Sequence, residues 1–431
     1  MKFSAYRRFK TSRSVQSLFE VFRRDRFPFL LESGRNTSLG RYSYFGSDPF
    51  LIFRHKNGRS NIRSAKVVSS LRDPDLAVLR KLLKKYELSG SLEPFLCGAV
   101  GFFSYDHGFS IEKIKRKNKP DPVVPDIMLA FYDTVVRFDH FSKEVLIFSS
   151  GFPELGIKRK TRADKRLLSV SERISQARMP DACGFPSKIE LVSNFSKKEY
   201  SKSIKKIKEY ITRGDIYQVN LAQKFSSKSD IDAWEVYRRL AHFFPVDFAA
   251  YFDAGDFSIM SASPEKFLKF DGRIVSTRPM KGTRPRGLDK VLDRLNRQEL
   301  FESKKEKAEL LMITDLERND LGRVCEYGSI KVACKRRIET YKGVFQATAE
   351  ITGELKKDKD RLDLIQACFP GGSITGAPKI RAMEIIEELE PCSRSIYTGA
   401  FGYLSFHNTL EFSILIRSFL KKGKELSFHA G

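Results

Sequence analysis

The pattern of hydrophobic and polar positions divides the chain into stretches of different character. Between about residues 17 and 151, short alternating and aromatic runs such as Asp126–Phe148 predict β-strands separated by turns. Residues 151–188 are first charged and then contain Pro and Gly, which predicts a helix and a linker. From Ile189 onward, strand patterns alternate with amphipathic helices. We therefore expect an amino-terminal region (1–150), a helix and linker (151–188), and a carboxy-terminal region (189–431).

Two helices are predicted most clearly. The first begins at Ser196, because Glu199 three residues later completes a capping box, and Gly214 is placed to end it. Its predicted buried face consists of Tyr200, Ile204, Ile207 and Ile211. The second begins at Gly376–Pro378, with proline in the first helical position, and ends at Pro391. Its predicted buried face consists of Ala382, Ile385, Ile386 and Leu389.

Two segments beside these helices have polar patterns that suit a binding site. Tyr217–Phe225 alternates, which predicts a strand with Gln218 and Asn220 on one face. These amides could line a polar cavity or face water, and the pattern does not decide. The Gly-rich segment Pro370–Gly376 precedes a helix, where free backbone N–H groups suit an anion. A turn without a ligand is equally compatible, and Ala377 stands where a Walker P-loop requires lysine.

Composition and charge exclude several classes of protein. The chain has 431 residues, of which 41% are hydrophobic and 12% aromatic, so it is neither disordered nor collagen-like. No apolar run approaches the ~18 residues that span a membrane. The six cysteines form no CxxC or His-flanked spacing, so we expect reduced thiols and a cytoplasmic location. The net charge of +25 is compatible with nucleic-acid binding, but a chemical motif takes precedence over charge.

One lysine is a candidate nucleophile. Lys281 follows the strand-like segment Arg273–Thr277 and lies between Pro279 and Gly282. To act as a nucleophile it must lose its proton, and an unperturbed lysine, with a pKa of about 10.4, is almost fully charged at neutral pH. Burial or nearby positive charge would lower that pKa. From these residues alone, a lysine in a surface turn is the simpler interpretation.

Carboxylates supply the other candidate chemistry. Glu306 and Glu309 are three residues apart and share one face of a predicted helix. Carboxylates without His or Cys favour a hard ion such as Mg²⁺, which also takes water and substrate oxygens. A charged, solvated helix face is the alternative.

The order of these segments resembles the chorismate-using enzymes, which include the anthranilate, aminodeoxychorismate, isochorismate and salicylate synthases. The resemblance covers roughly residues 15–431. It rests on six ordered motifs: Gly214–Leu221, Ser263–Glu265, Pro279–Thr283, Asp315–Val324, Gly371–Lys379 and Gly402–Phe406. Two amino-terminal segments also look like this family, Leu30–Ser33 and Gly40–Ser43.

The resemblance implies an α+β fold, with large antiparallel sheets flanked by helices and the active site in a cleft between them. Two positions distinguish the branches of the family. Members that add ammonia carry glutamine where the water-adding members carry lysine, and here that residue is Gln218. Aminodeoxychorismate synthases carry lysine in the Pro-x-Lys-Gly-Thr motif, where anthranilate synthases carry alanine, and here that residue is Lys281. The chain is thus most similar to the component I proteins of aminodeoxychorismate synthases, with anthranilate synthase component I as the alternative.

The resemblance also implies a reaction. Mg²⁺ held by Glu309 would bind the ring carboxylate of chorismate and act as a Lewis acid. Lys281 would attack carbon 2 while the carbon 4 hydroxyl leaves, and ammonia would then add at carbon 4 and expel the lysine. The product would be 4-amino-4-deoxychorismate, a precursor of para-aminobenzoate and folate. Glu265, in the Ser-Pro-Glu motif, would lie close to the ring.

The remaining site residues are implied in the same way. Arg417 matches the family arginine that holds a substrate carboxylate in a bidentate geometry. The substrate pocket would be completed by Thr375, Gly376 and Tyr403. Some relatives form a tryptophan pocket around the Leu-Leu-Glu-Ser motif, which here would involve Glu32 and Ser33.

A partner is expected, and two departures from the family pattern are visible. No Cys–His glutaminase module is recognisable, so the resemblance implies a separate glutamine amidotransferase that supplies ammonia, with free ammonia as the alternative. Gln346 stands where the family usually has a histidine, and an amide cannot donate a proton as an imidazolium does. The sequence ends at Gly431, where relatives continue into a helix with a second Mg²⁺-binding glutamate. A weakly active truncated relative, or a basic binding protein, is therefore a further alternative.

Overall fold

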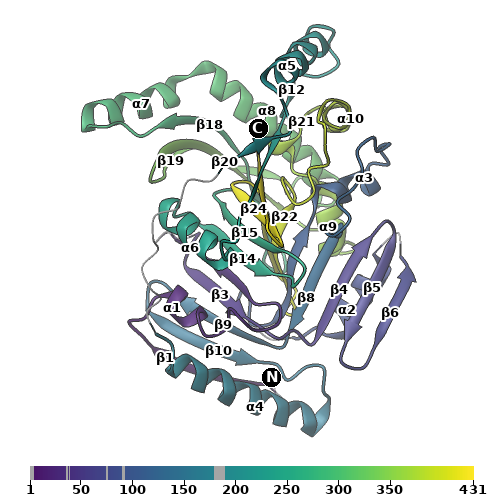
Figure 1. Ribbon diagram of the computed structural model, residues 1–431, viewed down its shortest axis with the longest axis vertical. Coiled ribbons are helices and arrows are strands. Elements are labelled where there is room, and N and C mark those ends of the chain that lie inside the picture. The colour runs from purple at the N-terminus through teal and green to yellow at the C-terminus, as the bar shows by residue number, and fades with distance from the viewer. Residues whose placement is uncertain (1–3, 35–36, 38, 74–75, 90–92, 179–189) are drawn as a thin grey trace.

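Two large antiparallel sheets pack face to face in the computed structural model, and helices cover their outer faces (Figure 1). The structure describes residues 4–34, 37, 39–73, 76–89, 93–178 and 190–431. The predicted α+β class, with large antiparallel sheets flanked by helices, is confirmed.

Within the described residues, the first sheet contains eleven strands. Strand β2 pairs with β14, so the sheet joins residues of the predicted amino-terminal region to residues of the carboxy-terminal region. The spatial order is β1 (Ala5–Lys10), β10 (Glu144–Ser149), β9 (Thr134–Asp139), β3 (Tyr42–Gly46), β2 (Phe29–Glu32), β14 (Phe248–Asp253), β15 (Ser258–Ser263), β24 (Ser418–Lys422), β25 (Glu425–Ala430), β13 (Gln223–Lys228) and β11 (Val192–Ser193).

The second sheet contains twelve strands and also joins both regions, through the pairing of β22 with β7. Strands β17 and β18 pair with successive parts of β20, and β19 (Lys331–Thr340) also pairs with β20. The spatial order of the others is β18 (Met280–Pro285), β20 (Val344–Glu354), β17 (Ile274–Arg278), β16 (Lys266–Phe270), β23 (Leu410–Ile414), β22 (Ala400–Ser405), β7 (Gly98–Phe103), β8 (Ile127–Tyr132), β4 (Leu51–Lys56), β5 (Arg59–Ser64) and β6 (Val68–Arg72).

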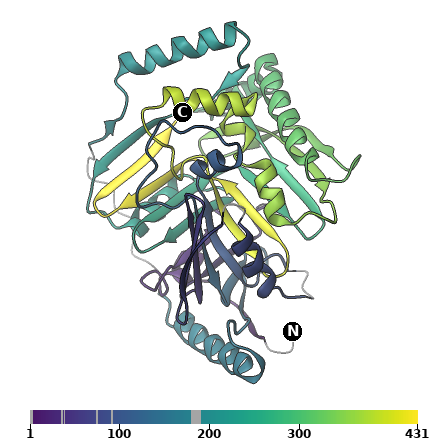
Figure 2. The ribbon, with the colours of Figure 1, turned by 90° about the vertical axis from the view of Figure 1, so that its right-hand side faces the viewer.

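The helices lie around these sheets, and a small third sheet pairs β12 (Gln218–Val219) with β21 (Gly376–Ala377). In both views α4 lies at the opposite end of the molecule from α5 (Figure 2). None of the described helices is both long and apolar enough to cross a membrane. The helices are α1 (Val15–Phe19), α2 (Ala77–Lys85), α3 (Gly108–Ile111), α4 (Gly156–Ser175), α5 (Lys197–Thr212), α6 (Ala233–Phe243), α7 (Lys290–Glu302), α8 (Lys304–Gly322), α9 (Arg361–Cys368) and α10 (Lys379–Leu389), with 3₁₀ turns η1 (Tyr105–His107) and η2 (Gly372–Ile374).

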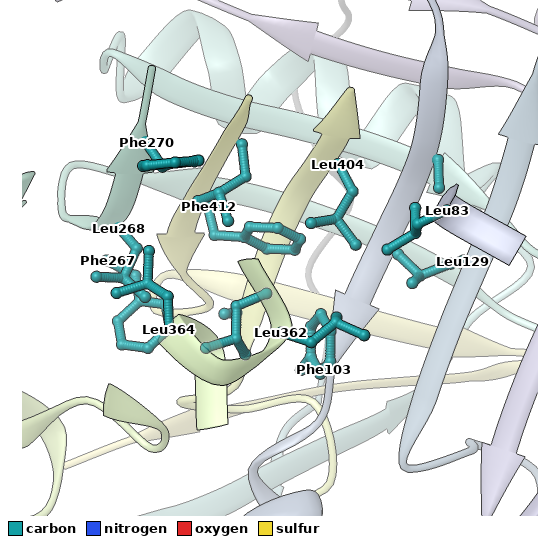
Figure 3. Close-up of a cluster of buried hydrophobic side chains, with 14 of the residues drawn as sticks. Leu83, Phe103, Leu129, Phe267, Leu268, Phe270, Leu362, Leu364, Leu404 and Phe412 are labelled. Carbon is teal, nitrogen blue, oxygen red and sulfur yellow. The ribbon is translucent and has the colours of Figure 1, made fainter. Parts of the chain in front are cut away.

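Alternation along the central strands explains the layers, because each strand buries both of its faces. In β8, every second residue points into the core between the two sheets: Met128, Ala130 and Tyr132. The residues between them point into an outer core that α2 and α9 cover: Ile127, Leu129 and Phe131. Figure 3 shows part of this outer core, with Phe103 on β7 and Phe412 on β23, the two strands that flank β22 in the second sheet. Another outer core lies between the first sheet and the helices α1, α4 and α6.

Several predicted elements are confirmed. Helix α5 begins with the capping box of Ser196 and Glu199, and Gly214 follows the helix with φ +81°. Three strands, β8, β9 and β10, form in and around the predicted stretch Asp126–Phe148. The helix predicted within residues 151–188 is α4, whereas residues 179–188 of the predicted linker lie outside the described residues.

The predicted buried face of α5 is wrong at one position. Ile207 is buried, but Ile211 is exposed, and Tyr210 packs in its place against the small core that α5 shares with α10. Tyr200 and Ile204 pack at the edge of the same core. The reason is that α5 packs on a small core formed with α10 and β12, so only a narrow stripe of the helix is covered.

Two predicted boundaries are also wrong. Tyr217–Phe225 is not one strand, because β12 ends before β13 begins. The helix predicted to start at Gly376–Pro378 starts at Lys379, with Pro378 as its N-cap. The cause is the same in both places, since Gly376 and Ala377 are extended and pair with β12. Pairing between segments about 160 residues apart cannot be seen in either local pattern.

We predict that Phe412→Ala destabilises the fold by about 3–5 kcal/mol, because it leaves a cavity in the outer core of the second sheet. Phe412 is 1% exposed, and its ring centroid lies 5.6 Å from that of Phe103. Urea unfolding measures the change. Phe141→Ala, at a residue that is 52% exposed, is the control. A loss for Phe412→Ala no larger than that of the control would contradict the assigned core.

Candidate active site

A cavity of about 570 Å³ lies where the end of the second sheet meets the first. Its walls come from β18, β20, β25, α6, η2 and the segment that links β23 to β24. Among its polar lining residues are Glu265, Lys281, Gln346, Ser373 and Arg417. Segments separated by more than 150 residues therefore bring several of the predicted site residues to one cavity.

A β-bulge places Lys281 in the cavity wall. From Met280 to Thr283 strand β18 advances three residues, while the opposite strand β20 advances two. The extra residue lies at Lys281–Gly282, and Gly282 has φ +88°, a conformation that favours glycine. Bulges re-aim side chains and are frequent beside active sites. The bulge thus explains why glycine follows lysine in this motif.

The Lys281 amine lies in a partly desolvated position among acidic side chains. Burial lowers its pKa below that of an ordinary lysine, while the charges of Glu265, Glu309 and Glu306 act in the opposite direction. A carboxylate oxygen of Glu306 would lie 2.9 Å from a Cβ atom placed on Gly282, so this carboxylate borders the bulge. The net effect favours the neutral, nucleophilic amine.

Glu265 is buried in the same wall, one residue before β16. The backbone N–H of Met280 donates a hydrogen bond to its Oε1, at 3.3 Å. Burial raises the pKa of Glu265, and the Ser373 hydroxyl and the Lys281 charge oppose that shift. A carboxyl with a raised pKa beside a lysine with a lowered pKa is an arrangement suited to proton transfer.

Arg417 lies where the chain crosses from β23 in the second sheet to β24 in the first. Its φ is +52°, and its carbonyl oxygen accepts a hydrogen bond from the Ala262 N–H, at 3.1 Å. Its guanidinium forms no ion pair with any side chain that the structure describes. Burial lowers its pKa. An arginine without an acidic partner on a cavity wall is suited to bind an anion.

Gln346 also lines the cavity, on β20. It is buried, and its Oε1 has no hydrogen-bond partner among the described groups. A buried, unpaired amide oxygen is costly unless a ligand or water satisfies it. Gln346, which stands where the family usually has a histidine, therefore lies in the cavity itself.

Three residues predicted to bind substrate lie together but outside the set that lines the cavity. Gln218 pairs with Ala377, and the N–H of Asn220 donates to the Thr375 carbonyl, at 2.9 Å. A Cβ atom on Gly376 would lie 2.2 Å from the Gln218 carbonyl oxygen, so only glycine permits this approach. The structure thus brings Gln218, Thr375 and Gly376 together, although none of the three lines the cavity.

The structure does not bring Tyr403 to this cavity. Its ring stacks on Phe95, with centroids 4.3 Å apart, and it lines a separate cavity of about 50 Å³ together with Glu32. Glu32 also borders a third cavity of about 310 Å³ and accepts a hydrogen bond from the Tyr237 hydroxyl, at 2.6 Å. Ser33 is buried beside it. The substrate role of Tyr403 and the tryptophan site at Glu32 and Ser33 stay predictions.

Comparison with known proteins agrees with this geometry. The sequence profile of the family described as chorismate binding enzyme matches residues 27–431. The chain belongs to the chorismate-binding enzyme family. The aminodeoxychorismate synthase component 1 of Bacillus subtilis is 35% identical over 408 residues, which are 93% of this chain and 85% of that protein. The predicted family is confirmed.

Two further relatives show the breadth of the chorismate-binding enzymes. The anthranilate synthase component 1 of Thermus thermophilus is also 35% identical, over 91% of this chain and 83% of that protein. The structure of anthranilate synthase component I from Streptococcus pneumoniae matches with a TM-score of 0.78 at 28% identity, over 92% of this chain and 88% of that chain. Identity alone therefore does not choose between the two activities.

The predicted metal ligand of this chorismate-binding enzyme lies near Lys281. Glu309 and Glu306 both belong to α8, and both act on the Lys281 charge. Glu306 pairs with Arg284 at 3.2 Å, and Glu309 with Lys305 at 3.6 Å. Within the described residues no cluster of three His, Cys, Asp or Glu side chains could hold a metal. One or two carboxylates suit Mg²⁺, which takes its other ligands from water and substrate.

Sequence reasoning missed one acidic residue behind the wall of this enzyme's cavity. Glu317 is buried in α8, in line with the helix's other buried positions, among them Leu310, Ile313, Thr314 and Leu321. These residues recur at helical spacing, so a carboxyl at a core position was a signal available in the sequence.

We predict that Gly282→Ala lowers the free energy of unfolding by about 1–2 kcal/mol, because alanine disfavours a positive φ. Gly343→Ala is the matched control, since that glycine has no positive φ and an added Cβ would meet open space. We expect the control to be neutral or slightly stabilising. Denaturant unfolding of both variants measures the difference, and equal stabilities would contradict the bulge.

Proposed function

We propose that this chain is component I of an aminodeoxychorismate synthase. In this proposal it replaces the carbon 4 hydroxyl of chorismate by an amino group and yields 4-amino-4-deoxychorismate. The relative from Bacillus subtilis bears the name of this activity. The observation that carries the proposal is Lys281, which a bulge holds in the cavity wall with its pKa lowered by burial.

The residues divide the chemistry between them. The neutral Lys281 amine attacks carbon 2 and the ring double bond shifts. The carbon 4 hydroxyl leaves as water after it takes up a proton, for which Glu265, with its raised pKa, is a candidate donor. Ammonia then forms a bond to carbon 4, the double bond shifts back, and the lysine amine is released. The sum is chorismate plus ammonia giving aminodeoxychorismate plus water. Covalent catalysis divides one difficult substitution into two easier ones.

Charge in the cavity supports a dianionic substrate. Arg417 lines the cavity without an acidic partner among the described side chains, and in this proposal it binds one carboxylate of chorismate. Glu309, with Glu306 beside it, would hold Mg²⁺, which would bind the other carboxylate and stabilise negative charge. The unpaired amide oxygen of Gln346 offers an acceptor for a substrate hydroxyl or for ammonia.

The amino group requires a source. We propose that a glutamine amidotransferase subunit supplies ammonia, as the "component 1" names of the relatives suggest. Free ammonia at raised pH would replace this partner in an assay, because the neutral molecule is the reactant.

We predict that Lys281→Ala lowers the formation of aminodeoxychorismate by at least about 100-fold, as expected when a nucleophile is removed. The assay contains chorismate, Mg²⁺ and ammonia at raised pH, and mass spectrometry identifies the product. Lys357→Ala, at an exposed lysine, is the control and should keep the wild-type rate.

The same assay separates the alternatives. An unchanged rate for Lys281→Ala would remove this lysine from the mechanism. Anthranilate and pyruvate as wild-type products would identify an anthranilate synthase. No turnover by the wild-type protein, with or without an amidotransferase, would favour a weakly active relative.

We predict that Arg417→Lys raises the KM for chorismate by about 10- to 100-fold, which corresponds to the loss of a hydrogen bond to a charged group. Lysine keeps the charge but cannot form the bidentate contact. Steady-state kinetics measure the change, with circular dichroism as the check on folding. A KM within twofold of the wild-type value would exclude Arg417 as a carboxylate ligand.

A further inference from the structure

We propose that Glu317 is a positioning residue: a buried carboxylic acid that keeps its proton at neutral pH and thereby limits the negative charge beneath Lys281 and Glu265. The inference rests in part on the proposed function, because the consequence for catalysis requires Lys281 as the nucleophile. The protonation of Glu317 itself does not depend on that function.

The geometry of Glu317 places it directly behind the cavity. The Thr277 hydroxyl, on β17, donates a hydrogen bond to its Oε2, at 2.8 Å. A Cβ atom on Gly372 would lie 3.7 Å from the Glu317 Cγ. Gly372 precedes Ser373, which lines the cavity and interacts with Glu265. Glu317 therefore contacts two segments that lead directly into the cavity wall.

Among the described residues, no cation forms an ion pair with this carboxyl. The charged groups that act on it are Glu265 from the cavity wall, Asp320 from its own helix and Lys379 from α10. Lys379 is committed to Asp320, with an Nζ to Oδ2 distance of 2.5 Å, and also donates to the Cys368 carbonyl. Two of the three charges are therefore negative, and the one cation already has an acidic partner.

Burial, together with the charges of Glu265 and Asp320, raises the pKa of Glu317 to about 8, against the opposing effects of the Thr277 hydrogen bond and the Lys379 charge. Glu317 is thus predominantly protonated at pH 7. Its ionisation above pH 8 would add a negative charge beneath the cavity wall, which favours the protonated form of the Lys281 amine. We therefore expect ionised Glu317 to limit the rise of kcat/KM at alkaline pH.

The sign of the stability effect follows from linkage. In the unfolded chain a glutamate ionises near pH 4.3, whereas folded Glu317 keeps its proton to about pH 8. Unfolding then releases a proton between these values, so the stability falls as pH rises through this window. Glu317→Gln imitates the protonated carboxyl and removes this fall.

The experiment compares wild type, Glu317→Gln and the exposed control Glu326→Gln. Infrared difference spectra between pH 6 and pH 9.5 should show loss of a protonated-carboxyl band in wild type and control, and no such band in Glu317→Gln. The melting temperature should fall more steeply with pH for wild type than for Glu317→Gln. Thr277→Val is a second variant, and it should move the band's midpoint to higher pH because the hydrogen bond lowers the pKa.

Activity adds a third result. The kcat/KM of Glu317→Gln should keep rising with pH above 8, where that of wild type levels off, with equal rates near pH 7. Absence of the infrared band in wild type, or a band that persists in Glu317→Gln, would overturn the proposal. If no variant has activity but the band and the melting curves behave as expected, Glu317 is confirmed as a buried acid and the proposed function fails.

Discussion

The position of Lys281 depends on one extra residue in strand β18. Without the bulge at Lys281–Gly282, strict alternation would turn every later side chain of β18 to the opposite face. With it, Lys281 lines the cavity beside Met280, which also packs in the outer core of the first sheet. Gly282 makes the bulge possible through its positive φ, so the Lys-Gly pair is one structural unit.

Desolvation changes the pKa values of the groups that lie beside the bulge. Desolvation in the cavity wall lowers the pKa of Lys281 and raises that of Glu265, so the two pKa values move toward each other, which suits proton transfer. Behind them, Glu317 forms no ion pair with a described cation and is accommodated as a neutral acid. Arg417 keeps its charge in the same cavity and supplies attraction for an anion. The family assignment agrees with a cavity that combines a desolvated lysine with a charged arginine.

Local signals predicted much of the fold and of the site. The capping box at Ser196 and the glycine after Lys281 are short-range features, and both have the structural roles that their residue types suggest. Long-range pairing was not predictable, since the link between β12 and β21 joins segments about 160 residues apart and sets where α10 begins. The direction of the Tyr403 ring depends in the same way on Phe95, from a distant loop. Glu317 could have been found as a carboxyl on a buried helical stripe.

The most direct test is the titration of the Lys281 amine in the folded protein. Acylation with a small reagent at a series of pH values, followed by mass spectrometry of the Lys281 peptide, gives the midpoint of deprotonation. The account predicts a midpoint below that of the same lysine in the denatured chain. A midpoint equal to or above the denatured value would show that the amine is solvated or held as an ammonium ion, and would contradict its role as a nucleophile.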